Sequence, residues 1–233
     1  MKLQFKYAFL MLCLTGAFFA CKDDKDTDVK PEEEKKDSIV NEYVTIKANG
    51  VVEIKSMPVP VASFFNYNLF SFSKMGLVGA GEDSVNTAAW DVGFQGAGLT
   101  MSPNWGGTAP GYWDGVDKFA MNPSDVSVVG YEDTTFDAIK AAPPATAFMH
   151  TLAMSPQTPV YNTETGELAY FDFPKRRVFV FKLNDGRYVK FQYVSYYKGA
   201  PETPTAEIYQ KDAGYWTFKY FISAKGSTDL TTK

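Results

Sequence analysis

The stretch that most constrains the fold is residues 177–197, RVFVFKLNDGRYVKFQYVSYY. Two runs rich in β-branched and aromatic residues flank Asn184, Asp185 and Gly186, and Gly186 can take the positive φ angle that closes a short loop. This pattern predicts a β-hairpin. Alternation gives both arms an apolar face, carried by Phe179, Phe181, Leu183, Val189, Phe191 and Tyr193, and a mixed face opposite it. Such a hairpin can cover a core on one side and meet water or a ligand on the other.

The composition extends this reading to the rest of the chain. Aromatic residues make up 16% of the 233 residues, with 13 Pro and 18 Gly, which suits short strands joined by turn-rich loops. Without an internal repeat or a second linker, we expect one all-β domain of many short antiparallel strands. The net charge of -4 and the absence of a concentrated basic run argue against nucleic acid as a partner.

The N-terminus resembles a bacterial lipoprotein signal peptide over residues 1–20. A basic start precedes an apolar run too short to span a bilayer permanently, and the run ends AFFAC, with Phe18 where leucine is usual. We expect Cys21 to become the lipidated N-terminus, carrying palmitate; the alternative is an ordinary secretory signal with Cys21 as a bystander. Cys13 leaves with the signal, so no disulfide is expected.

Residues 21–40 are charged and poor in apolar groups, which predicts a disordered acidic tether. The run KDDKD directly behind Cys21 resembles the surface-export signal of certain Gram-negative lipoproteins. This favours the outer face of the outer membrane over the periplasm, although a solvated tether would have the same composition. A β domain over 41–226 and a C-terminal tail over 227–233 complete the expected organisation.

Further strands are expected wherever alternation lies between turn signals. They cover 42–47 and 51–55, 68–73 and 77–78, 87–95, 125–130, 147–154, a hairpin over 159–173, and the closing edge or sheet-completing strands 207–210 and 215–223. A helical turn is expected over 134–140, and Trp90 is expected to anchor the core. The loop over 96–123 carries Trp105, Tyr112 and Trp113, and it is either a ligand platform or a flap tucked onto the core.

The residues offer little for catalysis, so we do not expect an enzyme. His150 is the only histidine, no thiol survives processing, and no G-x-S-x-G elbow occurs. Four carboxylates in turn-like contexts leave a two-carboxylate hydrolase as a remote possibility; they are Asp91, Asp114, Asp117 and Asp125. Zinc lacks a ligand set.

Methionine is the unusual feature of the middle of the chain. Met101, Met121 and Met154 each lie one residue before an Asn or Ser that precedes proline, and Met149 is adjacent to His150. Each could fill a gap in the core. A loop-borne thioether is also a soft ligand suited to haem iron, for which methionine and histidine both serve as axial ligands.

The chain as a whole resembles the HmuY-like haem-binding lipoproteins of oral and gut anaerobes. Besides the lipoprotein start, the resemblance covers nearly all of residues 42–223. Its features there are YNLFSFS at 67–73, AWDVGF at 89–94, the glycines Gly106 and Gly107, RVFVFKLNDGRYVK at 177–190, and residues 193–197 leading to the aromatic strand at 215–220. The resemblance implies an all-β fold that holds haem between two loop-borne axial ligands. It also implies delivery of haem to an outer-membrane TonB-dependent transporter.

The resemblance indicates one ligand more clearly than the other. Residues 148–156, FMHTLAMSP, match the family's second ligand setting and place Met154 at the ligand position. The stretch matching the first, 125–131, contains neither Met nor His, so Met121 is the nearest upstream candidate, with Met149 and His150 as alternates. The alternative function is a surface module without a metal, which holds a glycan or a partner protein on Trp105, Tyr112 and Trp113.

Overall fold

The computed structural model describes residues 35–59, 67–80, 87–95, 101–103, 126–149 and 157–232. Lys35–Lys233 is one compact unit. Its described part is built mainly of antiparallel strands, which confirms the predicted all-β, single-domain fold. No helix in these described ranges is long and apolar enough to cross a membrane.

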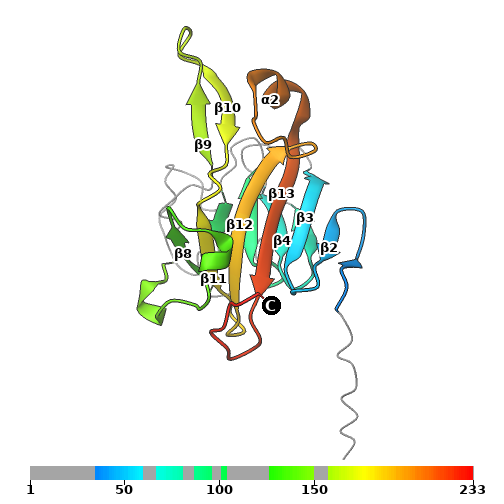
Figure 1. The fold of residues 1–233 in the computed structure, drawn as a ribbon, viewed down its shortest axis with the longest axis vertical. Coiled ribbons are helices and arrows are strands. Elements are labelled where there is room, and N and C mark those ends of the chain that lie inside the picture. Colours follow the sequence, from blue (N-terminus) through cyan, green and yellow to red (C-terminus); the bar gives the residue numbers. More distant parts are fainter. Residues whose placement is uncertain are drawn as a thin grey trace, which may run out of the picture. The chain divides into compact units, whose positions relative to one another are not determined.

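The larger sheet has seven strands in the order β1-β2-β3-β13-β12-β11-β8, with every neighbouring pair antiparallel. The strands are β1 Ser38–Ile39, β2 Val44–Ile46, β3 Val52–Pro58, β8 Ser127–Tyr131, β11 Val178–Lys182, β12 Tyr188–Tyr197 and β13 Ala213–Ile222. The last strand of the chain, β13, lies between β3 and β12, and the two ten-residue strands β12 and β13 run side by side through the sheet (Figure 1).

A second sheet of four strands and a separate hairpin complete the strand content. The four strands, in the order β5-β4-β6-β7, are β4 Tyr67–Ser71, β5 Gly76–Ala80, β6 Val92–Gln95 and β7 Met101–Pro103. The hairpin pairs β9 Thr158–Tyr161 with β10 Leu168–Asp172. Within the described residues the helical elements are the 3-10 turns η1 Phe136–Ala138 and η2 Ala145–Ala147 and the helix α2 Ala206–Asp212.

The predicted hairpin at 177–197 is confirmed as β11 and β12. Phe179 pairs with Phe191 and Phe181 with Val189, in the register that a short loop imposes. Gly186 closes that loop with a φ angle of 83°, and the carboxylate of Asp185 accepts a hydrogen bond from the Arg187 N–H at 3.1 Å. The expected turn and the expected face alternation therefore fix this pair of strands.

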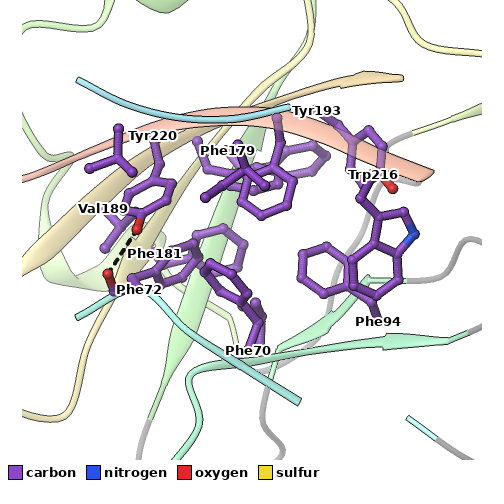
Figure 2. Close-up of a cluster of buried hydrophobic side chains, with 14 of the residues drawn as sticks. Phe70, Phe72, Phe94, Phe179, Phe181, Val189, Tyr193, Trp216 and Tyr220 are labelled. Carbon is purple, nitrogen blue, oxygen red and sulfur yellow. Dashed lines mark hydrogen bonds between the residues drawn. The ribbon is translucent and has the colours of Figure 1, made fainter. Parts of the chain in front are cut away.

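The core lies between the two sheets and is dominated by aromatic rings (Figure 2). Phe70, Phe72 and Phe94 lie on or next to strands of the smaller sheet. Their rings contact aromatic rings of the larger sheet in edge-to-face or tilted arrangements. The Tyr220 hydroxyl crosses the gap and donates a hydrogen bond to the Phe72 carbonyl at 2.9 Å. Edge-to-face contacts of this kind add to the stabilisation from burial alone, so the two sheets form one packed unit.

The second face of the larger sheet differs from the expectation of a face open to water. Val178, Val180 and Lys190 on that face are fully buried. They are covered because η1 and the C-terminal segment pack across it: the Lys190 ammonium donates hydrogen bonds to the Ile139 carbonyl at 3.0 Å and to the Leu230 carbonyl at 2.9 Å. The part of this face around Val194 and Lys55 remains open.

Four local predictions need correction. The strand expected over 207–210 is wrong: α2 covers it, begun by the Thr205 hydroxyl, which accepts the Ile208 N–H, and held by Tyr209 packing on Phe171. The strand over 87–95 is reduced to β6, and within 147–149 there is only a single bridge at Met149. The closing strand 215–223 is confirmed as β13, which completes the sheet at its centre, the second of the two expected positions. Finally, β1 pairs with β2 inside the segment expected to be tether.

Candidate functional site

Most of the residues predicted to bind a ligand lie outside the described part of the chain. These are Met154, Met121, His150, Trp105, Tyr112 and Trp113, together with the lipidation candidate Cys21. Met149 is the only residue of the predicted site whose surroundings are described. In the described ranges there is also no group of three or more His, Cys, Asp or Glu side chains placed to hold a metal ion.

Met149 lies at the outer edge of the larger sheet. Its N–H donates to the Val128 carbonyl at 3.0 Å, and its carbonyl accepts the Val128 N–H at 2.8 Å, so one residue pair extends the sheet beyond β8. The neighbouring Phe148 ring packs against Tyr188 with ring centroids 5.7 Å apart. The backbone of Met149 is therefore fixed, while its side chain is 46% exposed. An exposed thioether at a fixed position suits a soft metal ion.

The described chain resumes at Gln157, next to the other end of β11. The Gln157 carbonyl accepts a hydrogen bond from the Arg177 guanidinium at 3.4 Å, just before the start of β11. Met149 pairs with Val128, which in turn pairs with Phe181 near the end of β11. The described chain thus stops at Met149, near the end of β11, and resumes at Gln157, near its start.

The structure adds a groove that the sequence did not indicate. It has a volume of about 1020 Å³ and lies on the open part of the second face of the larger sheet. Its floor is formed by β3, β12 and β13, including Gln192, Val194 and Thr217, and its walls are the segments 133–137, 172–176 and 200–204. Val194 is 43% exposed there. A volume of this size is typical of sites that hold a small molecule.

The charges in the groove largely pair with one another. Lys175 contacts Glu202 at 2.9 Å and Lys55 contacts Glu53 at 3.1 Å, while the Gln192 amide donates to the Lys175 carbonyl at 2.5 Å. The aromatic rings that line the groove, Phe136, Phe173, Tyr193 and Phe218, are almost fully buried, so they present no open face. The groove therefore offers hydrogen bonds to a polar ligand and neither a soft donor nor a flat apolar surface for a porphyrin.

Asp91, one of the four carboxylates considered for catalysis, has a structural role. Its carboxylate accepts the Phe72 N–H at 2.8 Å and so ties the chain before β6 to the end of β4. Burial raises the pKa of Asp91, and the Phe72 N–H opposes this shift. Arg187 nearby pairs with Asp185 at 2.6 Å. The other three carboxylates, Asp114, Asp117 and Asp125, lie outside the described residues.

Sequence alternation could have located the floor of the groove but not its walls. Gln192 and Val194 fall on the mixed face predicted for the second arm of the hairpin. The walls come from three segments separated by many residues in the chain, which come together because β8, β11 and β12 are neighbours in the sheet, while β13 joins the floor strands β3 and β12. No local sequence pattern predicts that these segments lie together.

Together these features define a single-domain, all-β protein with an open polar groove and an anchored methionine at its sheet edge. No protein-family model matches the sequence, and no curated protein matches it. Among solved structures, one that is similar is the crystal structure of a “putative lipoprotein” from Bacteroides fragilis, with 13% identity, a TM-score of 0.40, and coverage of 75% of this chain and 91% of that chain. A likeness at this level does not define a function for this chain.

Proposed function

We propose that the protein is a non-enzymatic haem-binding lipoprotein of the HmuY-like type, anchored through Cys21 at the outer face of the outer membrane. It captures haem and passes it to an outer-membrane TonB-dependent transporter. The order of the sequence motifs supports the family, and the all-β fold agrees with it. The structural observation that carries the proposal is Met149, whose backbone is bonded to β8 while its thioether stays exposed.

In this proposal Met154 is the principal axial ligand of the iron. Met121, Met149 and His150 are the candidates for the second ligand. Haem supplies an iron atom that takes two axial donors, and thioether sulfur binds Fe(II) in preference to Fe(III) because it is a soft ligand. Of the candidates, Met149 has the described geometry that fits this role, since a donor on a fixed backbone loses little freedom when it binds.

The test is haemin titration of the mature chain, residues 21–233 with Cys21→Ser, under reducing conditions. We expect sharp low-spin absorption bands in the parent chain and their loss in Met154→Ala. Met149→Ala shifts the bands or weakens binding by at least about tenfold if Met149 is the second ligand, because even the loss of an outer-shell partner of a metal ligand costs about that much. Met75→Leu, in the turn between β4 and β5, is the matched control and leaves the spectrum unchanged.

Two results would count against haem. A featureless titration of the parent chain removes haem as cargo, and an unchanged spectrum in Met154→Ala removes Met154 from the site. Loss of the bands in Met75→Leu as well would indicate a general loss of structure, so circular dichroism accompanies each variant.

A second candidate function is a binding module without a metal, for a glycan or a partner protein. The specific observation in its favour is the groove of about 1020 Å³ with its paired charges and hydrogen-bonding floor. Val194→Arg would place a long side chain in this groove without touching any methionine. A glycan array that responds to the parent chain and not to Val194→Arg, together with a featureless haemin titration, would favour this function over haem capture.

A further inference from the structure

The two ends of the larger sheet carry opposite charge. We define the tether end as the end where the β2–β3 turn, the β11–β12 turn, the end of β13 and the start of β8 lie together. The strand register brings these parts to one end, because Val52 faces Tyr220, Val189 faces Ile222 and Ser127 faces Lys182. The segment that leads into β1 from the N-terminus also begins there, since Ser38 pairs with Ile46 next to the β2–β3 turn.

Cations outnumber acids at the tether end from Lys35 onward, whereas the tether before it, residues 22–34, carries three lysines against seven acids. The described residues at the tether end are Lys35, Lys36, Lys47, Lys74, Lys140, Lys182, Lys225 and Arg187, against Asp37, Asp91, Asp185 and Asp229. The opposite end has the reverse balance. It carries Glu132, Asp133, Glu164, Glu167, Asp172, Glu202, Glu207 and Asp212, against Lys175, Arg176, Arg177, Lys198 and Lys211. The chain has a net charge of -4, so this positive end runs against the overall charge.

The tether end is also hollowed. A hollow of about 550 Å³ lies between the segment before β1, the β2–β3 turn and the C-terminal segment, and Lys35, Lys36 and Lys47 line it, with Asp229 among the other lining residues. Asp37 fixes one wall, because its carboxylate pairs with Lys47 and accepts the Ala48 N–H at 2.9 Å. Asp37 thus holds Lys47 at the edge of this hollow, and the exposed Lys35 and Lys36 also line it.

We propose that the tether end is a docking surface for a membrane that carries anionic, phosphate-bearing lipid headgroups. This inference rests on the proposed lipid anchor at Cys21. The fourteen residues from there to Glu34 can span no more than about 50 Å even when fully extended. The anchor therefore keeps the tether end close to the headgroups, where clustered Lys and Arg side chains attract anionic lipid.

The charge pattern also sets an orientation. Charges farther than about 10 Å from the membrane surface are screened at physiological salt, so only the tether end contributes strongly to attraction. The acidic end is repelled from anionic lipid and faces away. Two walls of the groove, 172–176 and 200–204, belong to the acidic end, so docking leaves the groove open to the surroundings.

The test uses the unlipidated mature chain, residues 21–233 with Cys21→Ser, so that binding does not depend on acylation. It is sedimented with vesicles of phosphatidylcholine alone or with about one third phosphatidylglycerol. We expect at least about tenfold more binding to the anionic vesicles, lost at high salt. Lys35→Glu with Lys36→Glu lowers this binding about fivefold or more, while Lys198→Glu with Lys211→Glu, the matched change at the acidic end, leaves it unchanged.

Three outcomes would overturn the proposal. The first is equal binding to both vesicle types, and the second is an equal loss of binding in the two double variants with circular dichroism unchanged. The third is displacement of the bound protein by inorganic phosphate at constant ionic strength, which would indicate a site for a small soluble anion. Incorporation of labelled palmitate at Cys21 in cells tests the anchor separately. Palmitate incorporation without vesicle binding contradicts only the docking surface, whereas vesicle binding without palmitate contradicts only the anchor.

Discussion

Lys190 is a charged residue whose chemistry is changed by its burial in the fold. It is fully buried, yet its ammonium donates to the carbonyls of Ile139 and Leu230 and lies 4.4 Å from the centre of the Phe136 ring. One side chain therefore holds both η1 and the C-terminal segment on the sheet. Loss of water around the ammonium lowers the pKa of Lys190 to about 8.

The charged neighbours of Lys190 come from several elements. Asp137 of η1 and Asp229 of the C-terminal segment raise the pKa of Lys190, and Lys140 and Lys219 lower it. Burial remains the largest cause of the shift.

This shift predicts a pH dependence of stability. The folded chain releases the Lys190 proton near pH 8, and the unfolded chain keeps it to about 10.5, so the unfolded state binds more protons between these values. The free energy of unfolding therefore rises with pH in this window, by at most about 1.4 kcal/mol per pH unit. Urea unfolding from about pH 7 to 9.5 measures it, below the range in which unfolded tyrosines ionise.

Lys190→Met is the control for this pH dependence. It removes the titrating group and leaves two buried carbonyls without their donor, which costs about 2 kcal/mol or more. We expect this variant to be less stable at pH 7 and to lack the rise with pH. A rise of the same size in Lys190→Met would mean that another group produces it.

At the scale of elements, the sequence is informative where the backbone conformation is decided locally. The β11–β12 hairpin follows from Gly186 and from alternation in its two arms, and both are confirmed. The segment 207–210 shows the opposite case. Its length and composition fit a short strand, but the Thr205 cap and the contact between Tyr209 and Phe171 make it part of α2. Tertiary packing overrides local preference there.

Gly186 gives a direct test of the local signal. Its φ angle of 83° is unfavourable for any residue with a Cβ atom, and no atom lies within 4 Å of the place where that Cβ would be. Gly186→Ala therefore measures backbone strain alone, and we expect a loss of about 1 kcal/mol in the free energy of unfolding. Gly76→Ala is the matched control, because Gly76 has no positive φ angle and its nearest neighbour is 3.8 Å away. Equal losses in the two variants would contradict the strain argument.

At the scale of the whole molecule, one hydrogen bond links the two sheets within the aromatic core. Tyr220 donates to the Phe72 carbonyl, whereas the buried Tyr193 hydroxyl has no hydrogen-bond partner among the described residues (Figure 2). Tyr220→Phe should lower the free energy of unfolding by about 1 kcal/mol, while Tyr193→Phe should be neutral or stabilising, because it removes a buried donor that makes no bond. Equilibrium unfolding of both variants tests the contrast, and an equal loss in both would contradict it.

The candidate sites differ in how much of each could be predicted from the sequence. Met149 was already a candidate as an alternate for the other axial ligand, while Met154 is the residue of FMHTLAMSP that matches the family setting. The bonding of Met149 to Val128 could be seen only in the structure. The groove could not be predicted, because its walls join segments from 133 to 204 around a floor completed by β13. The order of strands in a sheet is set by contacts between distant parts of the chain, and local sequence patterns do not specify it.

The central position of β13 has a consequence for how this chain is made. Without the last strand, β1–β3 and the group β8, β11 and β12 have no common neighbour in the sheet. Synthesis and export both proceed from the N-terminus, so β1–β3, which pair with one another, cannot join the rest of the sheet until β13 has been made. Assembly is therefore post-translational and depends on contacts distant in sequence, which fold slowly. A chain that stops shortly before residue 213 would contain two half-sheets that β13 does not join. We expect proteases to degrade such a chain, so no shortened folded protein would accumulate.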